Sequence, residues 1–263
     1  MTKKRTRTES FEVLLEIVDE NFIRPPRDSQ RNSILNRALR EFEYDLEALN
    51  RLAGRFVCGK PRKFFSEDRT QVVLADVDIM EDWQLPVMNQ MVKAVTENPG
   101  DILEIGFGHG ISSRMIQKRN VRSHIIVECN DSVVERFNRW RAECKDKRIE
   151  LVHGLWQETV GSLGLFDGIL FHTYPLNEEE YIKYVHQGIT FAEHFFATAA
   201  QHLKKGGIFT YFSNEIDSLS REHQRSLFRH FSHISTSIIN LEIPESVEDS
   251  WWADSMVIVK AYK

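Results

Sequence analysis

The segment Asp101-Ile-Leu-Glu-Ile-Gly-Phe-Gly-His-Gly110 decides the fold. It joins a short apolar run, Ile102–Ile105, to three glycines, and a helical pattern follows at Ser112–Lys118. Glycines permit a tight turn and let the backbone approach a ligand without Cβ atoms in the way. A strand before such a loop and a helix after it are the context in which glycine loops bind nucleotides. The segment therefore predicts a nucleotide-binding turn; the competing interpretation is a purely structural turn.

The spacing of the glycines separates two kinds of nucleotide. Single residues separate the three glycines, unlike the G-x-G-x-x-G of dinucleotide sites, and an acid precedes them. The next apolar run ends at Glu128, 22 residues after Gly106, where an acid can accept hydrogen bonds from both ribose hydroxyls of an adenosine. We therefore predict S-adenosylmethionine (SAM) as the ligand, not NAD. The predicted site has Glu104, Gly106, Gly108 and Gly110 at the methionine end, Glu128 at the ribose, and Cys129 and Asn130 beside it.

Outward from the loop, strand and helix patterns alternate. The further apolar runs are Ser123–Val127, Ile149–Val152, Asp167–Phe171 and Gly207–Phe212, with helical patterns at Ser132–Cys144 and Glu178–Leu203. This alternation favours βαβ units and a parallel sheet. Two β-rich runs, Ser235–Ile243 and Ser255–Tyr262, come last and predict a hairpin. The sequence thus predicts an α/β fold with five parallel strands and a terminal antiparallel hairpin, which by analogy is the Rossmann-like class I methyltransferase sheet.

The first 75 residues have a different character. Two helical stripes, at residues 10–21 and 34–52, are separated by Pro25 and Pro26, which cannot continue a helix. We expect a helical N-terminal extension or lid at residues 1–75 and a SAM-binding domain at residues 76–263.

Composition excludes several classes of protein. The chain has 263 residues, of which 41% are hydrophobic, including 17 Phe and 5 Trp, so it can bury a full core. No apolar run reaches the ~18–20 residues of a membrane span, and the start, MTKKRTR, lacks the apolar stretch of a signal peptide. The net charge of −5 disfavours nucleic acid as a partner, and three cysteines without C-x-x-C disfavour a disulfide framework. We expect a cytoplasmic protein with a small-molecule substrate and no membrane partner.

Six motifs in collinear order, over about residues 78–212, carry a family resemblance. They are Glu104-Ile-Gly-Phe-Gly, Ile125-Ile-Val-Glu-Cys-Asn-Asp131, Gly154-Leu-Trp156, Phe166-Asp-Gly-Ile-Leu170, Thr173-Tyr-Pro-Leu176 and Leu203-Lys-Lys-Gly-Gly207. In combination they resemble guanidinoacetate N-methyltransferase and its relatives. The resemblance implies that Glu128 holds the ribose and that Leu155 and Trp156 lie beside the adenine. It also implies that the stretch Met80–Pro86 closes over the substrate. The N-terminal helices match the family poorly, although relatives use an N-terminal segment as a lid.

Two positions depart from the family pattern at the acceptor end of the site. The acid that grips the guanidinium after the fourth strand is His172 here, and the acid after the tryptophan of Met80–Pro86 is Gln84, so Glu81 is the acid that remains. A guanidinium binds best to paired carboxylates. We therefore expect guanidinoacetate to be a poor substrate and predict a small amine or amino-acid-like acceptor, neutral or zwitterionic. The predicted catalytic residues are Glu81, His172 and Tyr174, and the predicted substrate-binding residues are Gln84, Ser213 and Asn214.

The roles of two of these side chains stay open. His172 could serve as a base, since histidine titrates near neutral pH, or only donate a hydrogen bond to cofactor or backbone. Tyr174 could orient the nucleophile or simply pack beside Pro175.

Other functions stay open as well. The α-amine of SAM could attack its own γ-carbon, giving azetidine-2-carboxylate and methylthioadenosine, and such a cyclase needs no cation-binding acids. The chain could also bind SAM without catalysis. No metal site is predicted, because His230 and His233, at helical spacing, have no third ligand nearby. The pair Trp251 and Trp252 could cover the substrate or a second copy of the chain, so a homodimer stays open.

Overall fold

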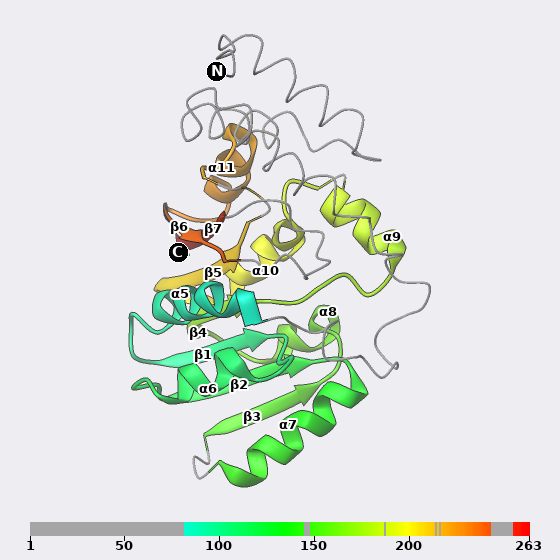
Figure 1. Cartoon of the computed structure of the whole chain (residues 1–263). Helices are drawn as coiled ribbons and strands as arrows, with labels where there is room; N and C mark the ends of the chain where they lie inside the picture. Colours follow the sequence, from blue (N-terminus) through cyan, green and yellow to red (C-terminus); the bar gives the residue numbers. More distant parts are fainter. Residues whose placement is uncertain (1–81, 145–147, 187, 214, 216, 243–254) are drawn as a thin grey trace, which may run out of the picture.

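The computed structural model describes residues 82–144, 148–186, 188–213, 215, 217–242 and 255–263. Over these residues, seven strands form one sheet with helices on both faces (Figure 1). The predicted boundary between residues 75 and 76 lies outside the described residues, as do Glu81, Asn214, Trp251 and Trp252.

The sheet has the predicted mixed topology. Its strands are β1 (Asp101–Ile105), β2 (Ser123–Glu128), β3 (Ile149–His153), β4 (Phe166–Phe171), β5 (Leu203–Phe212), β6 (His233–Asn240) and β7 (Ser255–Tyr262). Their order across the sheet is β3-β2-β1-β4-β5-β7-β6. Neighbours among β1 to β5 are parallel, whereas β7 is antiparallel to both β5 and β6. The prediction of a Rossmann-like class I methyltransferase sheet is therefore confirmed.

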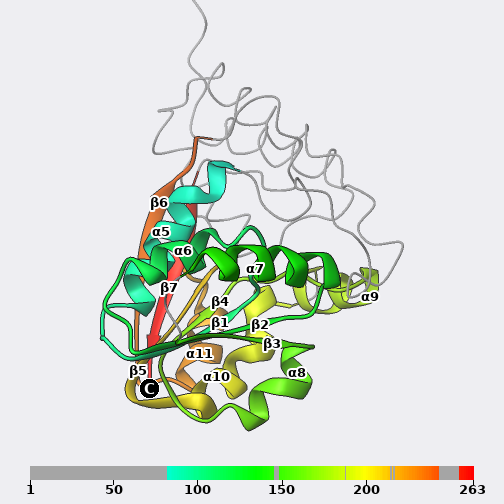
Figure 2. The ribbon, with the colours of Figure 1, turned by 90° about the horizontal axis from the view of Figure 1, so that it is seen from below.

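Helices cover both faces of the sheet (Figure 2). One face carries α5 (Leu85–Val95), α6 (Ile111–Gln117) and α7 (Asp131–Glu143), and the other carries α8 (Trp156–Thr159), α10 (Phe196–His202) and α11 (Arg221–Phe228). Local signals set where they begin. Pro86 stands in the first turn of α5. The Asn130 side chain caps α7, accepting hydrogen bonds from the backbone N–H groups of Ser132 and Val133.

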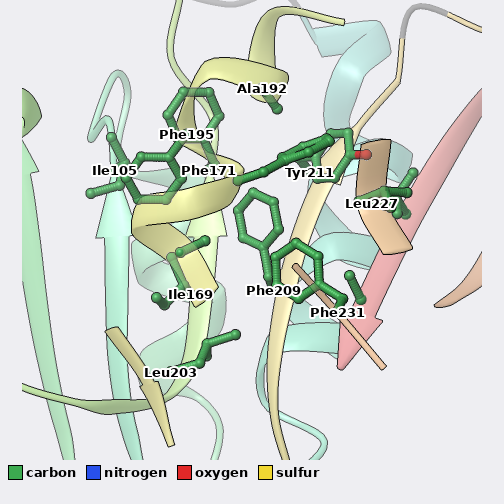
Figure 3. Packing of buried hydrophobic residues seen from close by; sticks show 14 of the residues in the cluster. Ile105, Ile169, Phe171, Ala192, Phe195, Leu203, Phe209, Tyr211, Leu227 and Phe231 are labelled. Atoms are coloured by element: carbon green, nitrogen blue, oxygen red, sulfur yellow. The ribbon is translucent and has the colours of Figure 1, made fainter. Parts of the chain in front are cut away.

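Buried aromatic side chains fill the space between the sheet and α10 and α11 (Figure 3). The rings of Phe171 and Phe195 stack with centroids 4.7 Å apart, and those of Phe209 and Phe231 with centroids 5.6 Å apart. Rings of this size bury much apolar surface, and their mutual packing adds about 0.5–1.5 kcal/mol per pair. The dense core fixes β4, which is one of the strands whose carboxyl ends form the candidate site.

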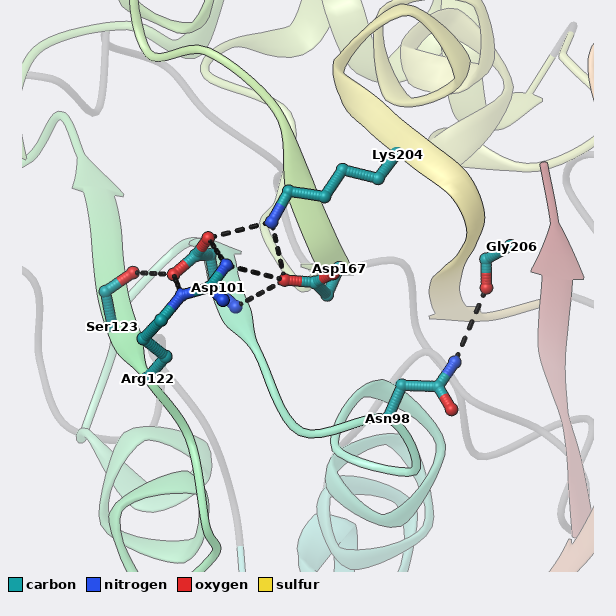
Figure 4. Close-up of polar contacts among 7 residues, drawn as sticks. All are labelled: Asn98, Asp101, Arg122, Ser123, Asp167, Lys204 and Gly206. Carbon is teal, nitrogen blue, oxygen red and sulfur yellow. Dashed lines mark hydrogen bonds and ion pairs between the residues drawn. The ribbon is translucent and has the colours of Figure 1, made fainter.

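A network of charged side chains holds the amino ends of four strands (Figure 4). The Lys204 ammonium lies 2.8 Å from Asp101 Oδ2 and 2.7 Å from Asp167 Oδ2. The Ser123 hydroxyl donates to Asp101 Oδ1 at 2.7 Å, and Arg122 pairs with the same carboxylate. Hydrogen bonds from Arg122, supported by Lys204, hold the pKa of Asp101 far below its usual range. Because these contacts stand at the amino edge, they leave the carboxyl edge free for ligands.

Two predictions about helices are wrong. The segment predicted as one helix from Glu178 to Leu203 is divided into α9 (Glu178–Glu180), a π-helix (Tyr181–His186), a 3₁₀-helix (Phe191–Phe195) and α10, and Leu203 already belongs to β5. Near the break, a Cβ at Gly188 would lie 2.2 Å from the Tyr184 carbonyl oxygen. The spacing of His230 and His233 favours one helix through both residues. In the structure α11 ends at Phe228, before either histidine, and His233 begins β6.

Candidate active site

Two adjoining pockets lie at the carboxyl ends of β1, β2 and β4. The larger, of about 670 Å³ and partly open to solvent, is lined by the glycine loop, the start of α7 and residues 172–176. The smaller, of about 360 Å³, extends toward the end of β3. They share the lining residues Gly106, Glu128, Cys129, Thr173, Tyr174 and Leu176, so they form one continuous surface. In open α/β sheets this is the edge at which ligands bind.

The glycine loop lies directly against the end of β4. Gly106, Gly108 and Gly110 have φ values of 91°, 52° and 70°, a region that favours glycine. A Cβ at Gly106 would lie 2.1 Å from the carbonyl oxygen of His172. The turn thus has the close backbone approach that the glycine spacing predicts, and it joins the predicted cofactor loop to the predicted acceptor residue.

Glu128 lines both pockets and organises the backbone around it. Its Oε2 accepts a hydrogen bond from Phe107 N at 2.9 Å, and its Oε1 accepts from Cys129 N at 2.8 Å and Asn130 N at 2.9 Å. A carboxylate has about four acceptor positions, of which the described residues use three. One position therefore remains for a ribose hydroxyl, not the two that hydrogen bonds from both hydroxyls would need. Because the backbone bonds also fix the orientation of the carboxylate, its chemistry fits a ribose.

Glu104 is placed differently from the expectation of a direct cofactor contact. Its side chain is fully buried and is not among the residues that line the pockets. The hydroxyl groups of Ser112 and Ser113 donate to its carboxylate, and His124 Nε2 lies 2.9 Å from Oε2. Glu104 therefore ties the beginning of α6 to β1 and β2, behind the glycine loop.

His172, Tyr174 and Gln84 come together as predicted residues of the acceptor end. The His172 ring lies between Phe212 and Tyr174, with centroid distances of 5.4 and 5.9 Å. Its Nε2 is buried and has no hydrogen-bond partner in the part of the chain that the structure describes. Burial lowers the pKa of His172 to about 4, against the opposing charge of Glu104, so the imidazole is neutral at pH 7. The Gln84 amide donates to the Tyr174 hydroxyl at 3.1 Å.

Ser213, expected to bind substrate, is engaged in a buried network. Its hydroxyl donates to Glu215 Oε2 at 3.3 Å and accepts from Glu215 N at 3.0 Å, and it does not line either pocket. His223 joins Glu215 to the Tyr211 hydroxyl, with contacts of 2.7 and 2.6 Å. This network anchors the segment after β5.

Leu155 and Trp156, for which the family resemblance implies a place beside the adenine, line the smaller pocket. Three further lining residues escaped sequence reasoning: Gln157, Glu180 and Phe191. Gln157 directly follows the motif Gly154-Leu-Trp156, which is the signal that points to it. Phe191 carries no signal of its own, and the acids at 178–180 look like an ordinary solvated helix start.

Among the described residues, no group of three or more His, Cys, Asp or Glu side chains could hold a metal ion. None of the described helices has both the length and the apolar character that crossing a membrane requires.

The model of the guanidinoacetate N-methyltransferase family matches residues 60–246, which is more than half of the chain. Among curated proteins, the chain is 27% identical over 113 residues to protein arginine N-methyltransferase 2 of Candida glabrata, covering 39% of this chain and 27% of that protein. It is 24% identical over 163 residues to the protein of the same name from Yarrowia lipolytica, covering 57% of this chain and 31% of that protein. The chain thus spans less than a third of the length of these relatives.

Solved structures show the same fold. The N-methyltransferase NodS from Bradyrhizobium japonicum WM9, in complex with S-adenosyl-L-homocysteine, matches with a TM-score of 0.51 and 10% identity, over 69% of this chain and 88% of that chain. Precorrin-6y C5,15-methyltransferase from Geobacter metallireducens GS-15 matches with a TM-score of 0.50 and 14% identity, over 73% of this chain and 98% of that chain.

Proposed function

Given that this chain belongs to the guanidinoacetate N-methyltransferase family and is a SAM-dependent methyltransferase, we propose that it methylates a nitrogen atom of a small acceptor without net positive charge, such as a zwitterionic amine. SAM supplies an electrophilic methyl group when it is bound. The acceptor is the proposed part.

The residues of the carboxyl edge divide into two proposed tasks. Glu128 accepts from the ribose, the glycine loop follows the methionine end, and Leu155 and Trp156 pack against the base. His172 and Tyr174 orient the acceptor nitrogen, because they line the larger pocket just after β4, where the His172 carbonyl lies against Gly106. Gln84 acts through Tyr174, to whose hydroxyl its amide donates. Orientation of this kind supplies much of the rate of a displacement, since the lone pair must approach the methyl carbon in line at about 3–3.5 Å.

The neutral imidazole of His172 is the observation that carries the choice of acceptor. Where the family has a carboxylate, this chain presents a buried ring whose pKa is lowered to about 4. Such a ring cannot balance a guanidinium, which favours paired carboxylates. It is also too weak a base to deprotonate an ammonium group. Its Nε2, without a partner among the described residues, can instead exchange a hydrogen bond with the uncharged amino group of an amino acid that has lost its ammonium proton to solvent before it binds.

A second candidate acceptor is the side chain of an arginine in a protein. The curated relatives reported above are named protein arginine N-methyltransferase 2, which favours it. The alternative of SAM cyclisation has no support from the family or these relatives, whose names are those of methyltransferases.

A panel of acceptors with methyl-labelled SAM tests the proposal. The panel holds glycine and β-alanine as zwitterionic amines, guanidinoacetate, L-arginine and an arginine-containing peptide. We expect label transfer to a zwitterionic amine and none to the guanidines. Preferred methylation of the peptide would replace the proposal with the protein acceptor. His172→Asp restores the family acid and should improve guanidinoacetate binding; no improvement would reject the reasoning from His172. A reaction with SAM alone, followed by mass spectrometry, checks for methylthioadenosine.

A further inference from the structure

We propose that Glu180 selects the adenine base of SAM by accepting a hydrogen bond from its exocyclic amino group. The proposal rests on the placement of the nucleoside given above, with the ribose at Glu128. It concerns the smaller pocket, on the side of Glu128 that faces the end of β3.

The walls of this pocket suit a planar base. Leu155 and Trp156 line it after β3, Leu176 after β4, and Phe191 from the 3₁₀-helix. Aliphatic and aromatic walls with few polar groups are typical of sites for flat, apolar ring systems. Selectivity then depends on the polar groups along the edge of the ring. Glu128 and Glu180 are the acidic residues that line this pocket in the described part of the chain, and Glu128 belongs to the ribose. Gln157 also lines it, but its amide offers both an acceptor and a donor and therefore does not discriminate between an amino group and an oxygen on the base.

The walls do not depend on Glu180. The His194 ring stacks on Tyr184 with centroids 4.3 Å apart and lies 5.3 Å from Trp156. Its Nδ1 donates to the carbonyl oxygen of Phe191, because a carbonyl can only accept. Phe191 and Trp156 are therefore held by His194, and a change at Glu180 leaves both in place.

The carboxylate of Glu180 is oriented by a single backbone bond. Leu176 N donates to its Oε2 at 3.0 Å, and Glu180 N donates to the Asn177 side chain at 3.0 Å. Among the described residues, Oε1 makes no hydrogen bond. A carboxylate can only accept. Adenine presents an N–H donor at position 6, whereas a 6-oxo purine presents an oxygen acceptor there. The carboxylate should therefore favour adenosine over inosine.

Glu180→Gln converts this geometry into a specificity switch. The glutamine oxygen can still accept from Leu176 N, and its amide NH₂ then replaces Oε1. An acceptor becomes a donor at one atom, with no change in size. We would measure the binding of two probes by calorimetry: S-adenosyl-L-homocysteine and S-inosyl-L-homocysteine. The wild-type protein should prefer the adenosyl compound by about 10-fold or more, as expected for a hydrogen bond to a charged group. The variant should lose that preference and favour the inosyl compound.

Glu179→Gln is the matched control, because this substitution removes the same charge at a neighbouring position. Glu179 is exposed and does not line the pocket. It should keep the wild-type preference. If Glu180→Gln melts like the wild type and keeps the wild-type preference, the role of Glu180 is refuted while the nucleoside site stands. If the wild-type protein fails to bind S-adenosyl-L-homocysteine, the site itself is wrong. Should Glu180→Gln unfold, Glu180→Ala provides the test: it should abolish the preference without reversing it, and a retained preference would overturn the proposal.

Discussion

Gly106 is where the glycine loop touches the end of β4, and Gly106→Ala is the sharpest test of that contact. The new methyl group would lie 2.1 Å from the His172 carbonyl oxygen, whereas ordinary contact begins at 3.4 Å, so the loop and the end of β4 must separate by more than 1 Å. The backbone φ of +91° adds about 1–2 kcal/mol of strain for any residue with a Cβ. A misplacement of about 1 Å can lower a catalysed rate about 100-fold.

Gly164→Ala separates the two effects. Gly164 has a similar φ of +85°, and a Cβ there would meet nothing within 4 Å. Both variants should lose about 1–2 kcal/mol of unfolding free energy through backbone strain. Only Gly106→Ala should also lose S-adenosyl-L-homocysteine affinity, by about 10-fold or more, and methyl-transfer rate, by about 100-fold.

Urea unfolding, calorimetry and turnover of the best acceptor provide the three measurements. If the two variants show dissociation constants for S-adenosyl-L-homocysteine within about twofold of each other and equal turnover rates, the close approach of the loop to His172 affects neither binding nor catalysis. That result would refute the reasoning.

Three further predictions concern single groups. Glu128→Ala removes the carboxylate that accepts three backbone N–H groups at the pocket, so SAM affinity by calorimetry should fall about 10–100-fold; unchanged affinity would remove Glu128 from the ribose. Burial lowers the pKa of His194 to about 4 in the folded chain, below the usual 6.5 of the unfolded chain. The contribution of His194 to the free energy of unfolding is therefore complete above pH 6.5. It falls by about 3 kcal/mol as the pH drops toward 4, because the unfolded chain then binds the proton more readily than the folded chain. His194→Phe should flatten that part of the pH–stability curve, and an equally steep curve would contradict it. Asp167→Asn weakens the contacts with Lys204 and should cost about 1 kcal/mol at low salt and less in 1 M NaCl; urea titrations that give equal losses in both salts would show that the pair contributes no electrostatic stability.

The strands and the glycine loop could be predicted because their signals are local. β1 is almost entirely buried, so its apolar run stands out, and the positive φ values of its loop require the glycines that the sequence displays. Glu128 follows from its distance along the chain from that loop. The apolar patterns of the two hairpin strands are equally clear, although their place in the sheet is known only from the pairing of β7 with β5.

The rest depends on contacts between distant segments. Phe191 lines the smaller pocket because the predicted helix breaks before this residue. Hydrophobic periodicity alone does not show that break. The sequence predicts that Glu104 contacts the cofactor, whereas in the structure its buried carboxylate accepts hydrogen bonds from Ser112 and Ser113. Ser213 likewise looks available, but its hydroxyl is taken by Glu215. No spacing rule reveals which buried partner a polar side chain will find.

The position of β7 has a consequence for how the chain folds. β7 comes last in the sequence among the described strands, yet it lies between β5 and β6, and most of its residues are buried. Until it is synthesised, β6 has no hydrogen-bonding neighbour in the sheet, and one edge of β5 is exposed. Unpaired edges of this kind invite association with other chains. During translation, the helices around β1 to β4 can therefore assemble early, while the far side of the sheet can form only after β7 has been synthesised.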